Sequence, residues 1–213
     1  MKHQEFAAMG KKLLPDLPGF VVKGPMILKA PIGDILYALH FDGSDFDARA
    51  FYIEAFFMPF FAPTEFIYFT FGKRLGGEHG RWNADSPTIT SELSKTVRAE
   101  AVPFFESNST ISGIVEFLRS QVIPNARGLV NPHCQEALAY TLAKMGNSAA
   151  ALVVIDRMHE MLSKSSVGWE LEIKARSQLM REKLLQGPEA AQAQLGVWKD
   201  ETIRRLKLEN YCG

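Results

Sequence analysis

Residues 51–71, which read FYIEAFFMPFFAPTEFIYFTF, form the densest aromatic stretch of the chain, and their charged residues are two glutamates. Aromatic residues favour strands, so we expect two strands here, at about 49–58 and 65–73. Neighbouring side chains of a strand point to opposite faces of the sheet, yet Phe56 and Phe57 are both apolar. We therefore expect both side chains to be buried, with each face of the sheet covered by helices or by a second chain.

Composition narrows the class of protein. The chain has 213 residues, 46% of them hydrophobic, with 24 acidic and 24 basic residues. A general nucleic-acid binder needs a basic excess, so no nucleic-acid partner is expected. The N-terminus lacks the apolar core of a signal peptide, and the apolar runs are too short to span a bilayer as helices. Because two cysteines, Cys134 and Cys212, are too few for a disulfide scaffold, we expect a cytoplasmic protein without a membrane partner.

The first half of the chain predicts a helix and a small sheet. Apolar residues at helical spacing mark a helix at 3–14, and strands are expected at 20–30 and 34–42 before the two aromatic ones. Short turns favour antiparallel neighbours. We expect an α+β fold with an N-terminal helix and a four-stranded, mostly antiparallel sheet, followed by an all-helical C-terminal region. The predicted domains are residues 1–122 and 131–213, with a linker between them.

The second half is helical in pattern. Helices are predicted at about 90–106, 111–122, 132–146, 148–162, 168–186 and 188–209, with Asn131 and Pro132 as a typical helix start. Gly146 and Ala149 recur as Gly187 and Ala190, each at a junction between two helices. We therefore expect residues 132–209 to form two antiparallel helical hairpins, with Ala149 and Ala190 at helix–helix contacts.

A polar loop at 72–88 holds the densest group of candidate binding residues. Its charged and aromatic members are Lys73, Arg74, Glu78, His79, Arg81, Trp82 and Asp85. Guanidinium groups bind carboxylates and phosphates through charge-assisted hydrogen bonds, and a Trp can anchor a protein interface. We expect Arg74, His79, Arg81 and Trp82 to contact a protein partner or a small anionic ligand. The alternative is a loop whose arginines pair with nearby acids and whose Trp packs into the core.

Glu54 and His40 are candidates of a second kind. Glu54 lies among aromatic residues in one expected strand, and His40 lies in the neighbouring strand. A buried carboxylate usually has a partner or a raised pKa, so these two could line a pocket; the alternative is a carboxylate at a sheet edge reaching water. The five histidines lack metal-ligand spacing, and no phosphate-binding motif is present. No metal, cofactor or catalytic residue is therefore predicted.

Short motifs in residues 1–122 resemble a family of small bacterial α+β domains without a known function. They are the turn at 17–20, Leu-Pro-Gly-Phe; the Arg-Leu-Gly element at 74–76, followed by Trp82; and the segment at 103–106, Pro-Phe-Phe-Glu. The Gln/Lys segment frequent in that family's second strand is absent. Some relatives occur near bacterial toxin systems, so the resemblance implies an immunity-type binding role.

Residues 138–158 resemble a tetratricopeptide-type hairpin. Small and apolar residues stand at the positions where that repeat packs its two helices, namely Ala139, Leu142, Gly146, Ala151 and Ile155. The early Trp of that repeat is missing, and the second copy matches poorly.

Two functions remain open from the sequence. The first is a non-enzymatic protein-binding module, and the second is a small-molecule-binding protein or enzyme that uses the sheet face and the loop 72–88. A homodimer is a further alternative, since a second chain could cover the apolar sheet.

Overall fold

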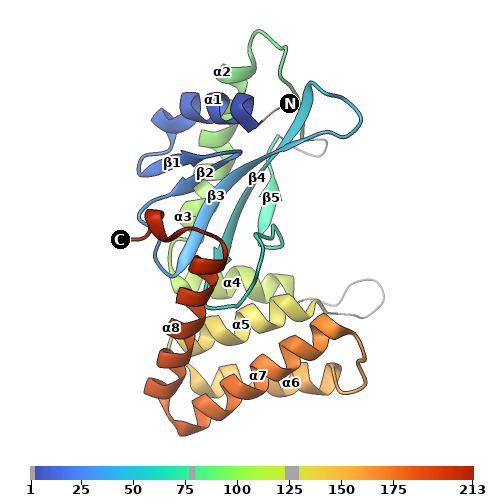
Figure 1. The fold of residues 1–213 in the computed structure, drawn as a ribbon, viewed down its shortest axis with the longest axis vertical. Coiled ribbons are helices and arrows are strands. Elements are labelled where there is room, and N and C mark those ends of the chain that lie inside the picture. Colours follow the sequence, from blue (N-terminus) through green and yellow to red (C-terminus); the bar gives the residue numbers. More distant parts are fainter. Residues whose placement is uncertain (1–2, 77–79, 123–129) are drawn as a thin grey trace. The chain divides into compact units, whose positions relative to one another are not determined.

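The computed structural model describes residues 3–76, 80–122 and 130–213. They form the expected α+β fold: an N-terminal helix, an antiparallel sheet and an all-helical C-terminal region (Figure 1). The chain divides into two compact units. The sheet unit consists of Met1–Met58, Ile67–Ser107 and Leu208–Gly213, and the helical unit consists of Pro59–Phe66 and Asn108–Lys207.

In the part of the chain that the structure describes, the sheet has six strands where four were expected. The helices of the sheet unit are α1 (His3–Leu13), α2 (Ile89–Thr96) and α3 (Val102–Ser107), with the short helical turns η1 (Leu14–Asp16), η2 (Val97–Ala101) and η3 (Glu209–Tyr211). Its strands are β1 (Phe20–Lys23), β2 (Met26–Lys29), β3 (Ile35–Gly43), β4 (Ala50–Pro59), β5 (Gly72–Arg74) and β6 (Arg81–Asn83). The order is β1-β2-β3-β4-β5, with β6 also pairing with β4.

Two features account for the higher strand count. The turn at Gly24, whose φ is 57°, splits the expected strand at 20–30 into the hairpin of β1 and β2. The loop expected at 72–88 instead contributes β5 and β6, which pair with successive parts of β4.

The strand predicted at 65–73 is wrong except at its end, where β5 begins at Gly72. The hydroxyl of Thr64 both accepts a hydrogen bond from the Phe66 amide and donates one to the Phe66 carbonyl. Such local side-chain bonds favour a turn over a ladder. Aromatic composition alone therefore overestimated the strand content of this segment.

One face of the sheet carries the main core. Phe6 and Leu13 of α1, together with Leu93 of α2 and Phe105 of α3, pack with Leu39 and other strand residues in a single buried cluster. The helix from α2 to α3 contains a π-helical turn, η2, directly before Pro103. Because proline cannot donate a backbone hydrogen bond, the wider turn lets the helix continue past Pro103, over the range expected from the sequence.

The other face of the sheet is apolar as well. Phe56 and Phe57 point to opposite faces and are both fully buried, as expected. Phe57 stacks on Phe71 and Phe104, whereas Phe56 meets the edge of Phe69. The expectation of burial on both faces is therefore confirmed at these positions.

The helical unit contains α4 (Ile111–Gln121), α5 (Pro132–Lys144), α6 (Ser148–Met161), α7 (Gly168–Gln186) and α8 (Pro188–Arg205). The side chains of Thr110, Asn131 and Asn147 cap α4, α5 and α6 by accepting backbone hydrogen bonds. Gly146, with φ 82°, ends α5: its amide bonds to Ala143 and that of Asn147 to Leu142, which is a Schellman motif. The four helices expected at 132–209 are thus present.

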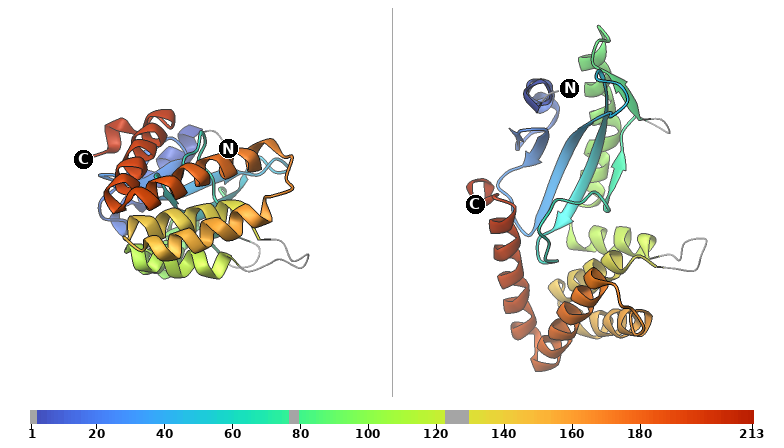
Figure 2. Two further views of the ribbon diagram at one scale, coloured as in Figure 1. Left: turned by 90° about the horizontal axis from the view of Figure 1, so that it is seen from below. Right: turned by 45° about the vertical axis from the view of Figure 1, so that its right-hand side comes forward.

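Helix α5 lies at the centre of this unit. It contacts α4, α6, α7 and α8, and every residue from Cys134 to Ala143 is buried. Helices α7 and α8 meet at Gly187 and Pro188 and diverge from that turn (Figures 1 and 2).

The expected contact residues of the hairpins need correction. Ala149 is exposed and Ala190 is half-buried. The buried small residues are instead Ala151 and Ala191, at 0% and 1% exposure. Helices α5 and α6 pack as the first expected hairpin, whereas α7 and α8 diverge from their turn (Figure 1). The spacing that suggested a repeat pointed to Ala149 and Ala190, which lie beside the buried alanines.

The expected domain limits also differ from the two units. Helix α4, placed in the first domain by the sequence, belongs to the helical unit, and so does the segment 59–66. The C-terminal residues from Leu208 onward belong to the sheet unit, where the Ile32 amide donates a hydrogen bond of 2.7 Å to the Tyr211 carbonyl.

Candidate functional site

The residues predicted from the loop 72–88 and from the sheet are largely engaged with each other. Arg74 of β5 lies opposite Glu54 of β4, with a guanidinium nitrogen 3.3 Å from the carboxylate. The same guanidinium lies over the ring of Tyr52, 4.4 Å from its centroid. Glu54 thus has a cationic partner at a sheet edge.

Arg81 and Trp82 are held in a similar way. Arg81 of β6 forms an ion pair of 2.6 Å with Asp47. Trp82 packs beside the core cluster, and its ring lies so close to Gly76 that a Cβ there would come within 2.6 Å of it. These contacts match the alternative considered for this loop, in which its arginines pair with nearby acids and its Trp packs against the core. His79 lies outside the described residues, and a role of these side chains toward a partner stays a prediction.

His40 lies on the second face of the sheet. Its ring stacks on Phe69, with centroids 4.7 Å apart. Burial lowers the pKa of His40, while the charges of Asp42 and Glu54 act in the opposite direction. A half-buried imidazole stacked on an aromatic ring fits a packing role.

The helical unit carries a more distinctive arrangement, which the sequence analysis did not identify. Helix α7 presents Trp169, Glu172 and Arg176 along one stripe, and α8 presents Trp198, Glu201 and Arg205 at the same spacing. Residues three and seven positions apart lie on the same face of a helix. The two stripes line one open groove of about 800 Å³.

Helix α5 forms a third stripe beside these two, made of His133, Glu136 and Tyr140. The His133 ring stacks on Trp169 with centroids 5.0 Å apart and an interplanar angle of 11°. The Tyr140 ring lies 5.0 Å from that of Trp198. Each tryptophan of the groove is therefore held by an aromatic ring of α5.

The same contacts give the directions of the helices. His133 of α5 contacts Trp169 of α7, and Glu136 contacts Arg176. The order of the contacts is the same along both helices, so α5 and α7 run in the same direction. Gln192, near the start of α8, donates to the carbonyls of Ala143 and Lys144 at the end of α5.

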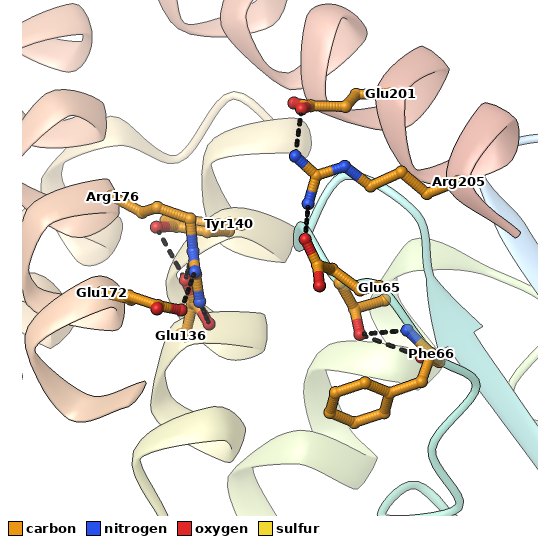
Figure 3. A network of polar contacts seen from close by, with 9 residues as sticks. Glu65, Phe66, Glu136, Tyr140, Glu172, Arg176, Glu201 and Arg205 are labelled. Carbon is orange, nitrogen blue, oxygen red and sulfur yellow. Dashed lines mark hydrogen bonds and ion pairs between the residues drawn. The ribbon is translucent and has the colours of Figure 1, made fainter. Parts of the chain in front are cut away.

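A buried ion pair joins α5 to α7 (Figure 3). Two nitrogens of Arg176 donate to the two carboxylate oxygens of Glu136, at 2.9 and 3.1 Å. The Tyr140 hydroxyl donates to the same carboxylate at 3.2 Å. Burial raises the pKa of Glu136, and the bonds and charge of Arg176 oppose that rise. Bidentate geometry of this kind fixes orientation as well as charge.

Arg205 performs a comparable role between α8 and the segment 59–66. Its guanidinium lies between Glu65 at 2.8 Å and Glu201 at 2.6 Å (Figure 3). The segment brings Phe66 to the same groove. Among the residues that the structure describes, the lining comprises Pro63, Thr64, Glu65, Phe66, His133, Trp169, Glu172, Ala175, Arg176, Trp198, Glu201 and Arg205.

The groove combines rigid walls with accessible aromatic surface. Trp169 is 44% exposed and Phe66 is 66% exposed, whereas the charged pairs behind them are fixed by the contacts above. A signal for this site was present in the sequence, since the pattern Trp-x-x-Glu-x-x-x-Arg occurs at 169–176 and again at 198–205.

Comparison with protein-family models, with curated proteins and with solved structures found no match. The resemblances inferred from the sequence therefore remain predictions. Among the residues that the structure describes, no three His, Cys, Asp or Glu side chains are grouped so that they could hold a metal ion. Within those same ranges, no helix is long and apolar enough to cross a membrane.

Proposed function

We propose that this chain is a non-enzymatic binding module, and that the groove between α7, α8 and the segment 59–66 receives an extended segment of a partner protein. The observation that carries the proposal is the pair of matched stripes, each with a Trp, a Glu and an Arg. Aromatic side chains presented on a rigid support are typical energetic centres of protein interfaces. The proposed location is the cytoplasm, as the cysteine content predicts.

The groove suits a protein segment better than a small molecule. The groove is open. Its floor is formed by two arginines that are already paired with carboxylates, Arg176 with Glu136 and Arg205 with Glu65. Sites for small ligands bury most of the ligand in a closed, largely apolar cavity. A groove in which the rings of Trp169 and Phe66 are exposed, while Trp198 is buried behind them, instead matches recognition of an extended chain.

The test is selection of peptides from a phage-displayed library of random nine-residue sequences on the full chain. Synthetic copies of the selected peptides are then titrated against Trp169→Ala and Phe66→Ala. Both side chains are exposed, so the fold should persist, and we expect affinity to fall about tenfold or more for each, as at an interface hot spot. Leu185→Ala, at an exposed position of α7 outside the groove lining, is the matched control.

Two outcomes would contradict the proposal. One is the failure of selection to enrich any peptide above background. The other is binding that is equally strong in both groove variants and in the control, which would place the interface elsewhere on the molecule.

A further inference from the structure

We infer that the groove recognises a basic side chain, Arg or Lys, of the partner segment. This inference rests on the proposed function and adds the chemistry of the ligand. The ligand charge inferred here is positive. The arginines of the loop 72–88 had instead predicted a negatively charged ligand.

The charges that line the groove are the first argument. Of the described side chains that line it, three are carboxylates, from Glu65, Glu172 and Glu201, and two are guanidinium groups, from Arg176 and Arg205. Arg176 is bound from behind by the buried Glu136, and Arg205 is shared by Glu65 and Glu201. Negative charge is therefore left over on the accessible side of the groove, above all at Glu172.

Glu172 is the best placed of these carboxylates. It is 74% exposed, and its distance to Arg176 is 4.0 Å, longer than the other ion pairs of the groove. It lies one turn after Trp169 on the same face of α7. A cation that contacts this carboxylate is therefore close to Trp169, whose ring is stacked on His133 on one face.

The rings supply the second argument. The face of a Trp ring attracts a cation within about 6 Å of its centroid. Burial, and secondly the charge of Arg176, lower the pKa of His133, so the ring stacked on Trp169 carries no charge at neutral pH and does not repel the ligand. Carboxylates beside indole faces are the side-chain combination that favours guanidinium and ammonium groups.

The space beside these groups is the third argument. Ala175 lies on the same lining between Glu172 and Arg176 and presents a single methyl group. Its small side chain leaves room for a long, flexible basic side chain, whose methylene groups can cover apolar surface while the charged end reaches the carboxylate.

The experiment uses the peptides selected on the full chain. We expect them to contain Arg or Lys at a shared position. Replacement of that residue by citrulline, or by norleucine for Lys, should weaken binding at least tenfold, and raising the salt concentration should weaken it further. Glu172→Gln should produce a similar loss in the protein, and Glu182→Gln, an exposed change elsewhere on α7, should leave affinity unchanged.

The outcomes separate the two proposals. If no peptide binds, the proposed function fails and this inference fails with it. If peptides bind in a manner that needs Trp169 but tolerates citrulline and Glu172→Gln, the function stands and the basic ligand is wrong. Spermidine is titrated in parallel: Glu172-dependent binding of spermidine without any peptide binding would overturn the assignment to a protein partner.

Discussion

At the scale of single residues, Glu136 and Arg176 form a bidentate ion pair in which the carboxylate is buried. Glu136 is 3% exposed and Arg176 is 24% exposed, so removing the carboxylate leaves a largely desolvated guanidinium without its bidentate partner. We expect Glu136→Gln to lower the free energy of unfolding by about 3 kcal/mol. Urea unfolding followed by circular dichroism measures this directly.

Two controls show whether burial is the cause. Asp156→Asn breaks the exposed pair between Asp156 and Arg181 and should cost less than about 1 kcal/mol. The double change Glu136→Leu with Arg176→Met replaces both charges by apolar groups and should recover most of the loss. A cost for Glu136→Gln no larger than that for Asp156→Asn would contradict this account.

His133 gives the groove a dependence on pH. Because its pKa is lowered in the folded protein, the unfolded chain binds a proton more readily, and stability falls as pH drops below about 6.5. His133→Phe keeps a ring against Trp169 but does not titrate. We expect the melting temperature of this variant to fall less than that of the unaltered protein between pH 7 and pH 5.

His40 and His159 also have lowered pKa values, and both are present in the unaltered protein and in the His133→Phe variant. Comparing the two melting curves at each pH therefore isolates the contribution of His133. Parallel curves for the two proteins would show that this imidazole titrates as it does in the unfolded chain.

At the scale of elements, the hairpin of α5 and α6 depends on one small residue. Ala151 is fully buried, while Ala149, two positions earlier on α6, is exposed. We expect Ala151→Leu to overpack the contact and cost about 1–3 kcal/mol. Ala149→Leu, the matched control, should change stability by less than about 0.5 kcal/mol. Chemical denaturation compares them, and equal effects would mean that the two positions do not differ in packing.

At the scale of the whole molecule, the chain passes from one unit to the other four times, so neither unit is one continuous segment. Helix α4 buries Ile114, Val115 and Leu118 and contacts the central helix α5. We expect a fragment of residues 108–207 to melt cooperatively. A fragment of residues 131–213, which follows the limits expected from the sequence but lacks α4, should lose cooperativity or melt at lower temperature.

Circular dichroism of the two fragments measures this difference. A fragment spanning residues 131–213 that melts as cooperatively as the longer helical one would show that α4 is dispensable. That result would favour the boundary expected from the sequence over the one defined by packing.

The sequence by itself determined the α+β class, the positions of the C-terminal helices and the burial of the aromatic strand at 50–59. Alternating side chains put Phe56 and Phe57 on opposite faces, and their apolar character required both to be covered. The helix start at Asn131 and the junction at Gly146 were likewise readable, because each depends on a few neighbouring residues. Local geometry and hydrophobic period act within a few residues of the chain, so they can be read without the fold.

Only the tertiary structure decided which helix faces contact one another. Glu136 lies in a helix whose polar and apolar residues do not separate into faces, so nothing local marks it as buried; four surrounding helices bury it and bring Arg176 to it from 40 positions away. Likewise, the loop 72–88 was rich in charge, but pairing with β4 and Asp47 turned its arginines into structural partners. The energies of such long-range pairs depend on distance and solvent access, which are set only when the helices and strands have packed.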